Sequence, residues 1–341
     1  MTTNFESEIR SQGELLRARA DGGAEAAARI AEAWRGLDYA LVAARGSSDN
    51  AARFFQYLAG QRAGLVVALA APSLFEGVRV PGLRGAGVLA ISQSGRSPGM
   101  IDVIRAGREQ GRPTGAITNS LDSPLALESD VVIDLGVGPE LAIASTKTFT
   151  ATWHALGQIV SALGSEPLDG LDATADAVGE VIEWALGAEM PVELIDAPRG
   201  LTMVGRGVGY ATACEIALKV REVSGLRAEA FAAPDYLHGP IGADATDTAL
   251  TLILTDELSD AVAEELLATG RALGARTLVI RPRGRHPLGA DVDLELPFGT
   301  PNWLTGLLEV VVGQVLTLRL GERRGRSIDS SPVLSKVTTS A

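Results

Sequence analysis

The sequence predicts an α/β protein made of two tandem, doubly wound (flavodoxin-like) domains, each a parallel sheet between two helical layers in a three-layer αβα sandwich. Three observations support this fold. Short apolar runs alternate with helical patterns, several runs end in small polar residues, and the order of these signals occurs twice in 341 residues. We expect lead-in helices and a first domain over residues 1–168, a second domain over 169–325, and a tail over 326–341.

The composition limits the classes of partner. Because 30 basic residues face 42 acidic ones, a net charge of −12 disfavours nucleic acid and anionic membranes, although local dipoles can still hold a small anion. Cys214 is the only cysteine, which excludes an intrachain disulfide and a multi-cysteine zinc site. The start of the chain is polar and no apolar run looks long enough to span a bilayer, so we expect a cytoplasmic protein. No histidine and carboxylate spacing suggests a metal, and no cofactor is expected.

The first half has the clearest order of elements. Residues Glu6 to Trp34 carry an alanine-rich helical pattern that Gly22 and Gly23 interrupt. Strands are then expected, in alternation with helices, at Tyr39–Ala44, Leu65–Leu69, Val88–Ile91, Thr114–Ile117 and Val131–Leu135. A stretch rich in Gly, Ser, Asp and Pro (Gly164 to Asp172) is the expected hinge between the halves.

The second half repeats the first. A strand at Leu201–Val204 precedes Arg206-Gly207, which align with Arg45-Gly46 at an offset of 206 − 45 = 161 residues. With one residue inserted, the stretch Ala70 to Gly77 matches Ala232 to Gly239. This pattern indicates an internal duplication.

One loop of the first half suggests an anion site. Ser92, Gln93, Ser94, Gly95 and Ser97 follow a buried strand and precede a helix. At such a junction, unpaired backbone N–H groups and the helix dipole attract an anion such as phosphate, and the serines add donors. Taken alone, the loop would be read as an ordinary serine-rich helix cap.

The second half carries different chemistry. At the position of the serine loop it has Asp256 and Glu257, whose carboxylates would repel an anion. It also holds Glu215, Lys219 and Glu222, spaced to share one face of a helix at the margin of its buried side, and His238 in a turn. The sequence therefore predicts one half that binds and one that reacts, with a pocket between them. A solvated ion pair and a surface histidine are the simpler alternatives.

The sequence does not support a dinucleotide-binding protein or a serine hydrolase. The glycines at 205, 207 and 209 do not fit the dinucleotide fingerprint, and no Gly-x-Ser-x-Gly elbow marks a hydrolase nucleophile.

Together these stretches resemble tandem sugar isomerase (SIS) domains, as in the isomerase part of glucosamine-6-phosphate synthase. Residues 92–97 resemble the phosphate loop of that family, Ala144-Ser145-Thr146-Lys147 its second ligand loop, and Arg45 to Ser48 the turn after its first strand. Residues 215–224 and 228–240 resemble the stretch with its catalytic lysine, glutamate and histidine, and the tail resembles its closing segment.

The resemblance implies a role for each matching residue. The residues that would hold phosphate and sugar are Ser92, Gln93, Ser94, Ser97, Ser48 and Ser145. Lys219 would move the O1 proton, Glu222 would shuttle a proton between C1 and C2, and His238 would open the ring. Lys336 matches the active-site lysine of the tail. The resemblance also implies a homodimer, with His238 acting either in its own chain or across the interface.

The chain starts with Met1-Thr2-Thr3 and a helical lead-in rather than a cysteine and a glutaminase domain. The expected activity is therefore that of an SIS-type glucosamine-6-phosphate deaminase, which converts glucosamine 6-phosphate and water to fructose 6-phosphate and ammonia. A fructosamine-6-phosphate deglycase and a galactosamine-6-phosphate deaminase/isomerase remain open alternatives. A non-catalytic sugar-phosphate sensor is the alternative from another class.

Overall fold

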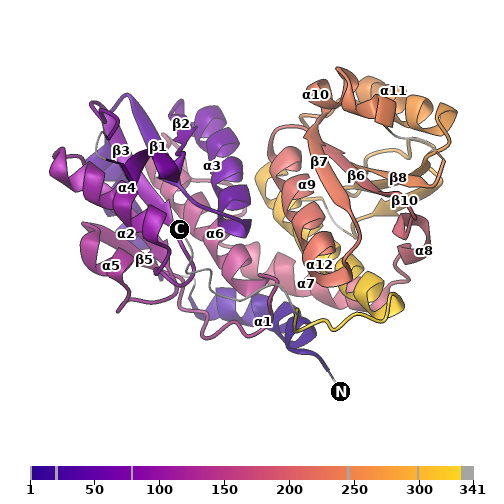
Figure 1. Ribbon diagram of the computed structural model, residues 1–341, viewed down its shortest axis with the longest axis horizontal. Coiled ribbons are helices and arrows are strands. Elements are labelled where there is room, and N and C mark those ends of the chain that lie inside the picture. The colour runs from indigo at the N-terminus through magenta and orange to yellow at the C-terminus, as the bar shows by residue number, and fades with distance from the viewer. Residues whose placement is uncertain (1, 20–21, 78–79, 244–245, 298, 332–341) are drawn as a thin grey trace. The chain divides into compact units, whose positions relative to one another are not determined.

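The computed structural model describes residues 2–19, 22–77, 80–243, 246–297 and 299–331. They form two compact units, each built on one five-stranded parallel sheet (Figure 1). In the part that is described, the first-sheet unit takes its residues from 14–140 and 147–172, and the second-sheet unit from 2–13, 141–146 and 173–331. The first residues of the chain thus pack with the second sheet, whereas the sequence analysis placed them in the first domain.

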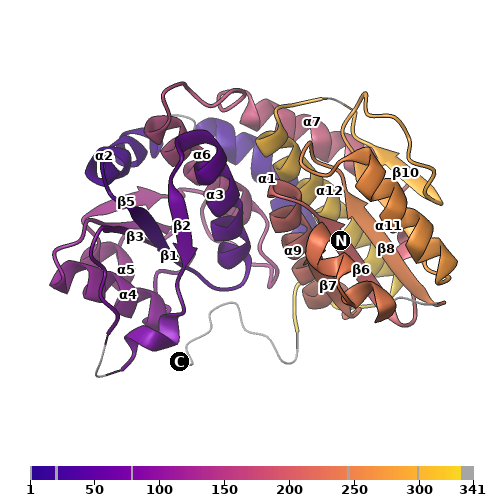
Figure 2. The ribbon, with the colours of Figure 1, turned by 90° about the horizontal axis from the view of Figure 1, so that it is seen from above.

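The first sheet has the order β2-β1-β3-β4-β5, with parallel pairing throughout. Its strands are β1 (Tyr39–Ala43), β2 (Val66–Leu69), β3 (Ala86–Ile91), β4 (Thr114–Thr118) and β5 (Val131–Asp134). Its helices are α2 (Ala24–Trp34), α3 (Ser47–Ala63), η1 (Pro72–Phe75), α4 (Pro98–Glu109), α5 (Pro124–Glu128) and α6 (Lys147–Leu163). Helices α2, α3 and α6 pack together over one face, and α4 and α5 cover the other (Figure 2).

The second sheet has the order β10-β9-β8-β6-β7, again all parallel. Its strands are β6 (Gly200–Gly205), β7 (Ala228–Ala232), β8 (Thr248–Ile253), β9 (Arg276–Arg281) and β10 (Val292–Glu295). The other elements are α1 (Asn4–Ala18), which begins in this unit, α7 (Thr174–Gly187), α8 (Val192–Ile195), α9 (Val208–Lys219), η2 (Val220–Ser224), α10 (Ala233–Leu237), η3 (Pro240–Ala243), α11 (Asp260–Ala272) and α12 (Asn302–Arg323).

The two sheets confirm the α/β prediction and repeat each other. Taken in chain order, the strands of both sheets are arranged second, first, third, fourth, fifth. The first strands start 200 − 39 = 161 residues apart, and the third strands 248 − 86 = 162 residues apart. The inserted residue inferred from the sequence therefore lies between the first and third strands of the second sheet.

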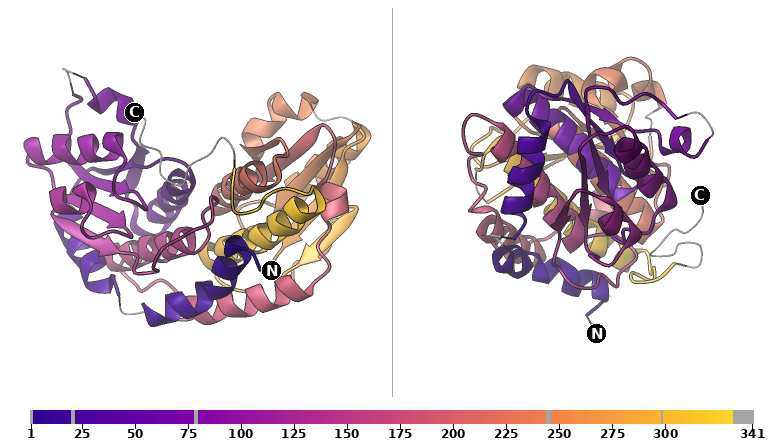
Figure 3. Two further views of the ribbon diagram at one scale, coloured as in Figure 1. Left: turned by 60° about the horizontal axis from the view of Figure 1, so that its bottom comes forward. Right: turned by 90° about the vertical axis from the view of Figure 1, so that its left-hand side faces the viewer.

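Helix α12 is the core helix of the second-sheet unit, and it packs against α7 and α9 (Figure 3). By length and composition alone it could cross a membrane, the one such helix among the described residues, which corrects the expectation that no apolar run is long enough. In the structure, 94% of its apolar window is buried. Its apolar surface is thus covered by the protein itself.

A close helix crossing holds α9 against α12. A Cβ atom added to Gly313 of α12 would lie 2.5 Å from the side chain of Ile216 on α9. Ile216 is fully buried, so it has little room to move. The missing side chain at Gly313 therefore sets how closely the two helices approach.

We predict that Gly313→Ala destabilises the protein by about 1 kcal/mol, because overpacking of about 1–3 kcal/mol outweighs the gain of about 1 kcal/mol in helix propensity. The matched control is Gly179→Ala in α7, where an added Cβ meets nothing within 4 Å and propensity alone should stabilise. Urea unfolding measures both variants. An equal increase in the free energy of unfolding for both variants would show that Gly313 does not limit the approach of the two helices.

His154 of α6 is buried in the first-sheet unit, and its Nδ1 lies 3.2 Å from Nη1 of Arg19. Burial and the nearby Arg19 charge lower the pKa of His154 from 6.5 to about 4. A hydrogen bond with the backbone of Leu171 raises the pKa by a smaller amount. The imidazole is therefore neutral in the folded protein at neutral pH.

Because the unfolded chain binds this proton at a higher pH, the free energy of unfolding should fall as the pH drops from 6.5 to about 4. The total loss is about 3 kcal/mol. Denaturant unfolding across this pH range should show a shallower slope for His154→Gln than for the parent. His286→Gln, which changes an exposed histidine, is the control. A parental slope in His154→Gln would refute this role.

Candidate functional site

In the first-sheet unit, the carboxyl ends of β1 and β3 form a topological switch point, which we call the β1/β3 crevice. These strands are neighbours, and the helices that follow them, α3 and α4, pack on opposite faces of the sheet. Ligands of open α/β sheets bind at such a switch point, where two helix N-termini direct unpaired N–H groups to one place. The serine loop and Ser48 both lie at this edge.

The serine loop is fixed by the neighbouring strand. The Ser92 N–H donates to the Ile117 carbonyl over 3.1 Å, and the Asn119 N–H donates to the Gln93 carbonyl over 3.0 Å. At Gly95, φ is +62°, and an added Cβ would lie only 2.0 Å from Oγ of Ser123, so no other residue fits. The loop is thus preorganised.

Its side chains form a short polar row. Ser92 is 6% exposed, and its Oγ lies 3.5 Å from Oγ of Ser97, the residue before α4. Oγ of Ser94 accepts the Arg96 N–H over 3.3 Å. These hydroxyls and the first amides of α4 make an arrangement suited to an oxyanion.

Ser48 reaches the same edge from α3. Helix α3 begins at Ser47, so Ser48 lies in the first helical turn. Gly46, the residue before the helix, has φ 58° and ψ −132°, and a Cβ atom added to it would meet nothing within 4 Å. The approach to this helix end is therefore open.

The second-sheet unit contains a buried charge cluster on α9 and η2. Nζ of Lys219 lies 2.5 Å from Oε2 of Glu222 and 3.5 Å from Oε1 of Glu215. The side chains of Lys219 and Glu215 are 1% and 0% exposed, whereas Glu222 is 23% exposed. A buried ammonium is stable only when paired, so the two carboxylates hold it charged. Glu222 is the member of the cluster that solvent or a ligand can reach.

The helix itself differs from the prediction. Helix α9 ends at Lys219 and continues as the π-helix η2, so the three groups do not share one regular α-helical face. Lys219 and Glu215 are also fully buried rather than at the margin of the buried side. Short π-helical turns often occur at functional sites because the wider turn re-aims side chains. A regular spacing of charges in the sequence gives no sign of it.

Among the other predicted residues, His238 and Ser145 lie on other elements than this cluster. His238 follows α10, is exposed, and makes no ring hydrogen bond or ion pair with the described residues. Ser145 is partly buried and precedes α6. The loop leading to it is held by Glu8 of α1, which accepts the N–H groups of Leu141 and Ala142. The predicted Lys336 lies outside the described residues.

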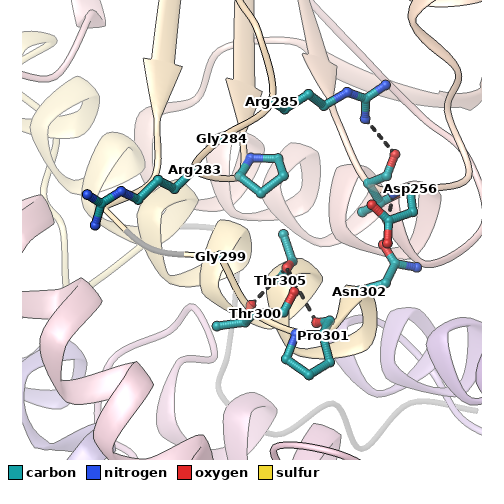
Figure 4. Close-up of a pocket in the computed structure, with 11 residues that line it drawn as sticks. Asp256, Arg283, Gly284, Arg285, Gly299, Thr300, Pro301, Asn302 and Thr305 are labelled. Carbon is teal, nitrogen blue, oxygen red and sulfur yellow. Dashed lines mark hydrogen bonds between the residues drawn. The ribbon is translucent and has the colours of Figure 1, made fainter.

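A cavity of about 460 Å³ opens at the carboxyl end of the second sheet (Figure 4). Its walls are the loop after β8, the loop after β9 and the N-terminus of α12. None of the predicted site residues lines it. Its lining residues are Thr255, Asp256, Pro282, Arg283, Gly284, Arg285, Gly299, Thr300, Pro301, Asn302 and Thr305. Among the residues that are described, no group of three or more His, Cys, Asp or Glu could hold a metal.

Two parallel sheets with this strand order, and a row of serine hydroxyls at the switch point of the first, define a doubly wound α/β fold class. Residues 38–162 match the family model of the SIS domain. The chain therefore contains an SIS domain. The matched range covers the first sheet, while the second sheet shares its strand order.

Known proteins agree with this assignment. The chain is 32% identical over 271 residues to a glutamine–fructose-6-phosphate aminotransferase [isomerizing] of Streptomyces coelicolor. The aligned region covers 74% of this chain and 44% of that protein. It thus spans less than half the length of this relative. A solved structure from Silicibacter pomeroyi, provisionally named a phosphosugar isomerase, is 28% identical with a TM-score of 0.84 over 96% of this chain and 99% of that one.

A further solved structure, the glucosamine-6-phosphate deaminase of Thermotoga maritima, is 21% identical. It has a TM-score of 0.78 and covers 98% of this chain and 99% of that one. At this identity the similarity concerns the fold.

The charge cluster gives a stability prediction. Lys219→Met should lower the free energy of unfolding by about 3 kcal/mol, because it removes the buried cation that lies 3.5 Å from the buried carboxylate of Glu215. The double variant Lys219→Met/Glu215→Gln should recover part of this loss, since it removes both charges. Urea unfolding at neutral pH measures each. Strictly additive losses would show that the two residues do not stabilise each other.

Proposed function

We propose that the chain is a sugar-phosphate isomerase whose first-sheet crevice binds the phosphate and whose Lys219–Glu222 pair moves a proton. The observation that carries the proposal is the partly exposed carboxylate of Glu222, held 2.5 Å from a fully buried lysine. The match to the SIS family and the names of the relatives support the substrate class. A sensor would need the crevice but not a positioned acid–base pair.

The chemistry follows from these groups. In the proposed reaction, His238 transfers a proton between O1 and O5 to open the ring. Glu222 removes the proton at C2 and returns it to C1, while Lys219 supplies the proton that O1 gains. The amino nitrogen then returns one proton to Lys219, so the steps together convert a 2-amino aldose into its isomer, the C2 imine of the ketose. Ser92, Gln93, Ser94 and Ser97, with Ser48 and Ser145, are the proposed substrate contacts.

For the particular reaction, we propose that glucosamine 6-phosphate is the substrate. Water hydrolyses the imine at C2, so that the products are fructose 6-phosphate and ammonia. Two alternatives use the same groups: galactosamine 6-phosphate as substrate, and deglycation of a fructosamine 6-phosphate. The relatives named aminotransferases favour a third, in which the same steps run in reverse and an amine adds to fructose 6-phosphate.

The test is ammonia and hexose 6-phosphate release from a panel of these sugars. Release from glucosamine 6-phosphate alone supports the proposed reaction, and turnover of another member reassigns the substrate. Substrate deuterated at C2 should give product with label at C1, because one carboxylate carries the proton across. Binding of every sugar phosphate without turnover would refute the enzymatic proposal.

We predict that Glu222→Gln lowers kcat by about 10²- to 10⁴-fold, the usual contribution of a positioned general base. The change of KM should be small, since the phosphate contacts lie on other elements. The control is Glu229→Gln on β7, which changes an exposed carboxylate of the same unit. Normal turnover by Glu222→Gln would remove this residue from the mechanism.

A further inference from the structure

The carboxyl ends of β6 and β8 form a second switch point, the β6/β8 crevice, which corresponds to the β1/β3 crevice of the first sheet. β6 and β8 are neighbours, as β1 and β3 are, and α9 follows β6 as α3 follows β1. The glycines before these helices have nearly the same backbone, with φ 58° and ψ −132° at Gly46, and φ 57° and ψ −127° at Gly207. The helix ends are therefore presented to their crevices in the same way.

The two crevices differ in what fills them. A Cβ atom added to Gly46 would meet nothing within 4 Å. One added to Gly207 would lie 2.7 Å from the carboxyl carbon of Glu257 and 2.7 Å from its Oε1. The same Oε1 accepts the N–H of Val208, the first residue of α9, over 3.4 Å. A carboxylate of the chain therefore sits where the first crevice is open.

The position of Glu257 in the repeat explains its place. With an offset of 162 residues, Glu257 corresponds to Gly95 of the serine loop. The sequence suggested that acidic residues here repel an anion. The contact with Val208 shows that this carboxylate is itself the anion at the helix end, where the helix dipole favours a negative charge.

A second acidic group lies close to Glu257. Glu309 of α12 is fully buried, and neither of its carboxyl oxygens has a hydrogen-bond partner in the described structure. Burial raises the pKa of Glu309 well above the usual value, and the charges of Glu257 and Asp256 raise it further. The positive charge of Arg285 lowers it, but by less than burial raises it. Of these two acidic groups, Glu257 is the one whose carboxyl oxygen contacts the N-terminus of α9.

We propose that the β6/β8 crevice is an oxyanion site of the same construction as the β1/β3 crevice, and that the carboxylate of Glu257 is its built-in ligand. Glu257 thereby limits each chain to one sugar phosphate and directs that ligand to the first sheet. The limit of one sugar phosphate per chain rests on the proposed function, whereas the filling of the β6/β8 crevice by Glu257 does not depend on it.

The test counts binding sites for inorganic phosphate by calorimetric titration. Glu257→Ser empties the crevice and should bind one more phosphate per chain than the parent. Glu257→Gln keeps the volume filled, and Asp256→Ser removes a neighbouring charge, so both should bind as many as the parent. No extra site in folded Glu257→Ser would overturn the proposal. An equal gain in all three variants would also overturn it, because simple repulsion would then explain the data.

Folding is checked by circular dichroism and thermal unfolding. Glu257→Gln should lower the melting temperature more than Asp256→Asn, because only Glu257 pairs with the helix end. If Glu257→Ser folds only with phosphate in the buffer, the crevice needs an anion and the proposal is supported. If Glu257→Gln melts at the parental temperature, the proposal is refuted. A parent that binds no phosphate, beside a Glu257→Ser variant that binds one, would refute the proposed function but support this inference.

Discussion

The structure depends on amide groups that the backbone cannot satisfy. In a parallel sheet of this strand order, the first and third strands are neighbours and their helices leave on opposite faces. Two helix N-termini then point to one crevice, and their free N–H groups need an acceptor. The two units differ in what lies there. The first has serine hydroxyls and an open approach at Gly46, and the second has the carboxylate of Glu257, which accepts the N–H of Val208.

The two halves of the duplication have therefore diverged at one loop and one helix. The loop after the third strand keeps small polar residues in the first half and becomes acidic in the second. The helix after the first strand ends in a π-turn in the second half, where it carries the buried Lys219 and its two carboxylates. The proposed phosphate site and the proposed proton-transfer pair place opposite demands on charge, and one fold present in two copies can meet each demand separately.

Much of the fold could be predicted because its signals are local. Buried parallel strands are continuous apolar runs, and β3 is buried at all six positions. The small polar residues that follow β1 and β3 are also a local signal, so the position of the switch point could be predicted from the sequence as well. The features that the sequence did not reveal depend on tertiary contacts. The π-helix, the full burial of Lys219, and the seating of Glu257 against Gly207 each need a partner distant in sequence. The predicted roles of His238 and Ser145 stay predictions.

The path of residues 2–13 determines how the chain can be divided. Asn4 and Phe5 donate to Asp329, and Gln12 bonds Gln314 over 2.8 Å, all within the second-sheet unit. A cut in the hinge at 164–172 would leave this segment on the fragment that carries the other sheet. The two halves of the sequence are thus not separable modules, and a fragment that carries the second sheet must also include residues 2–13.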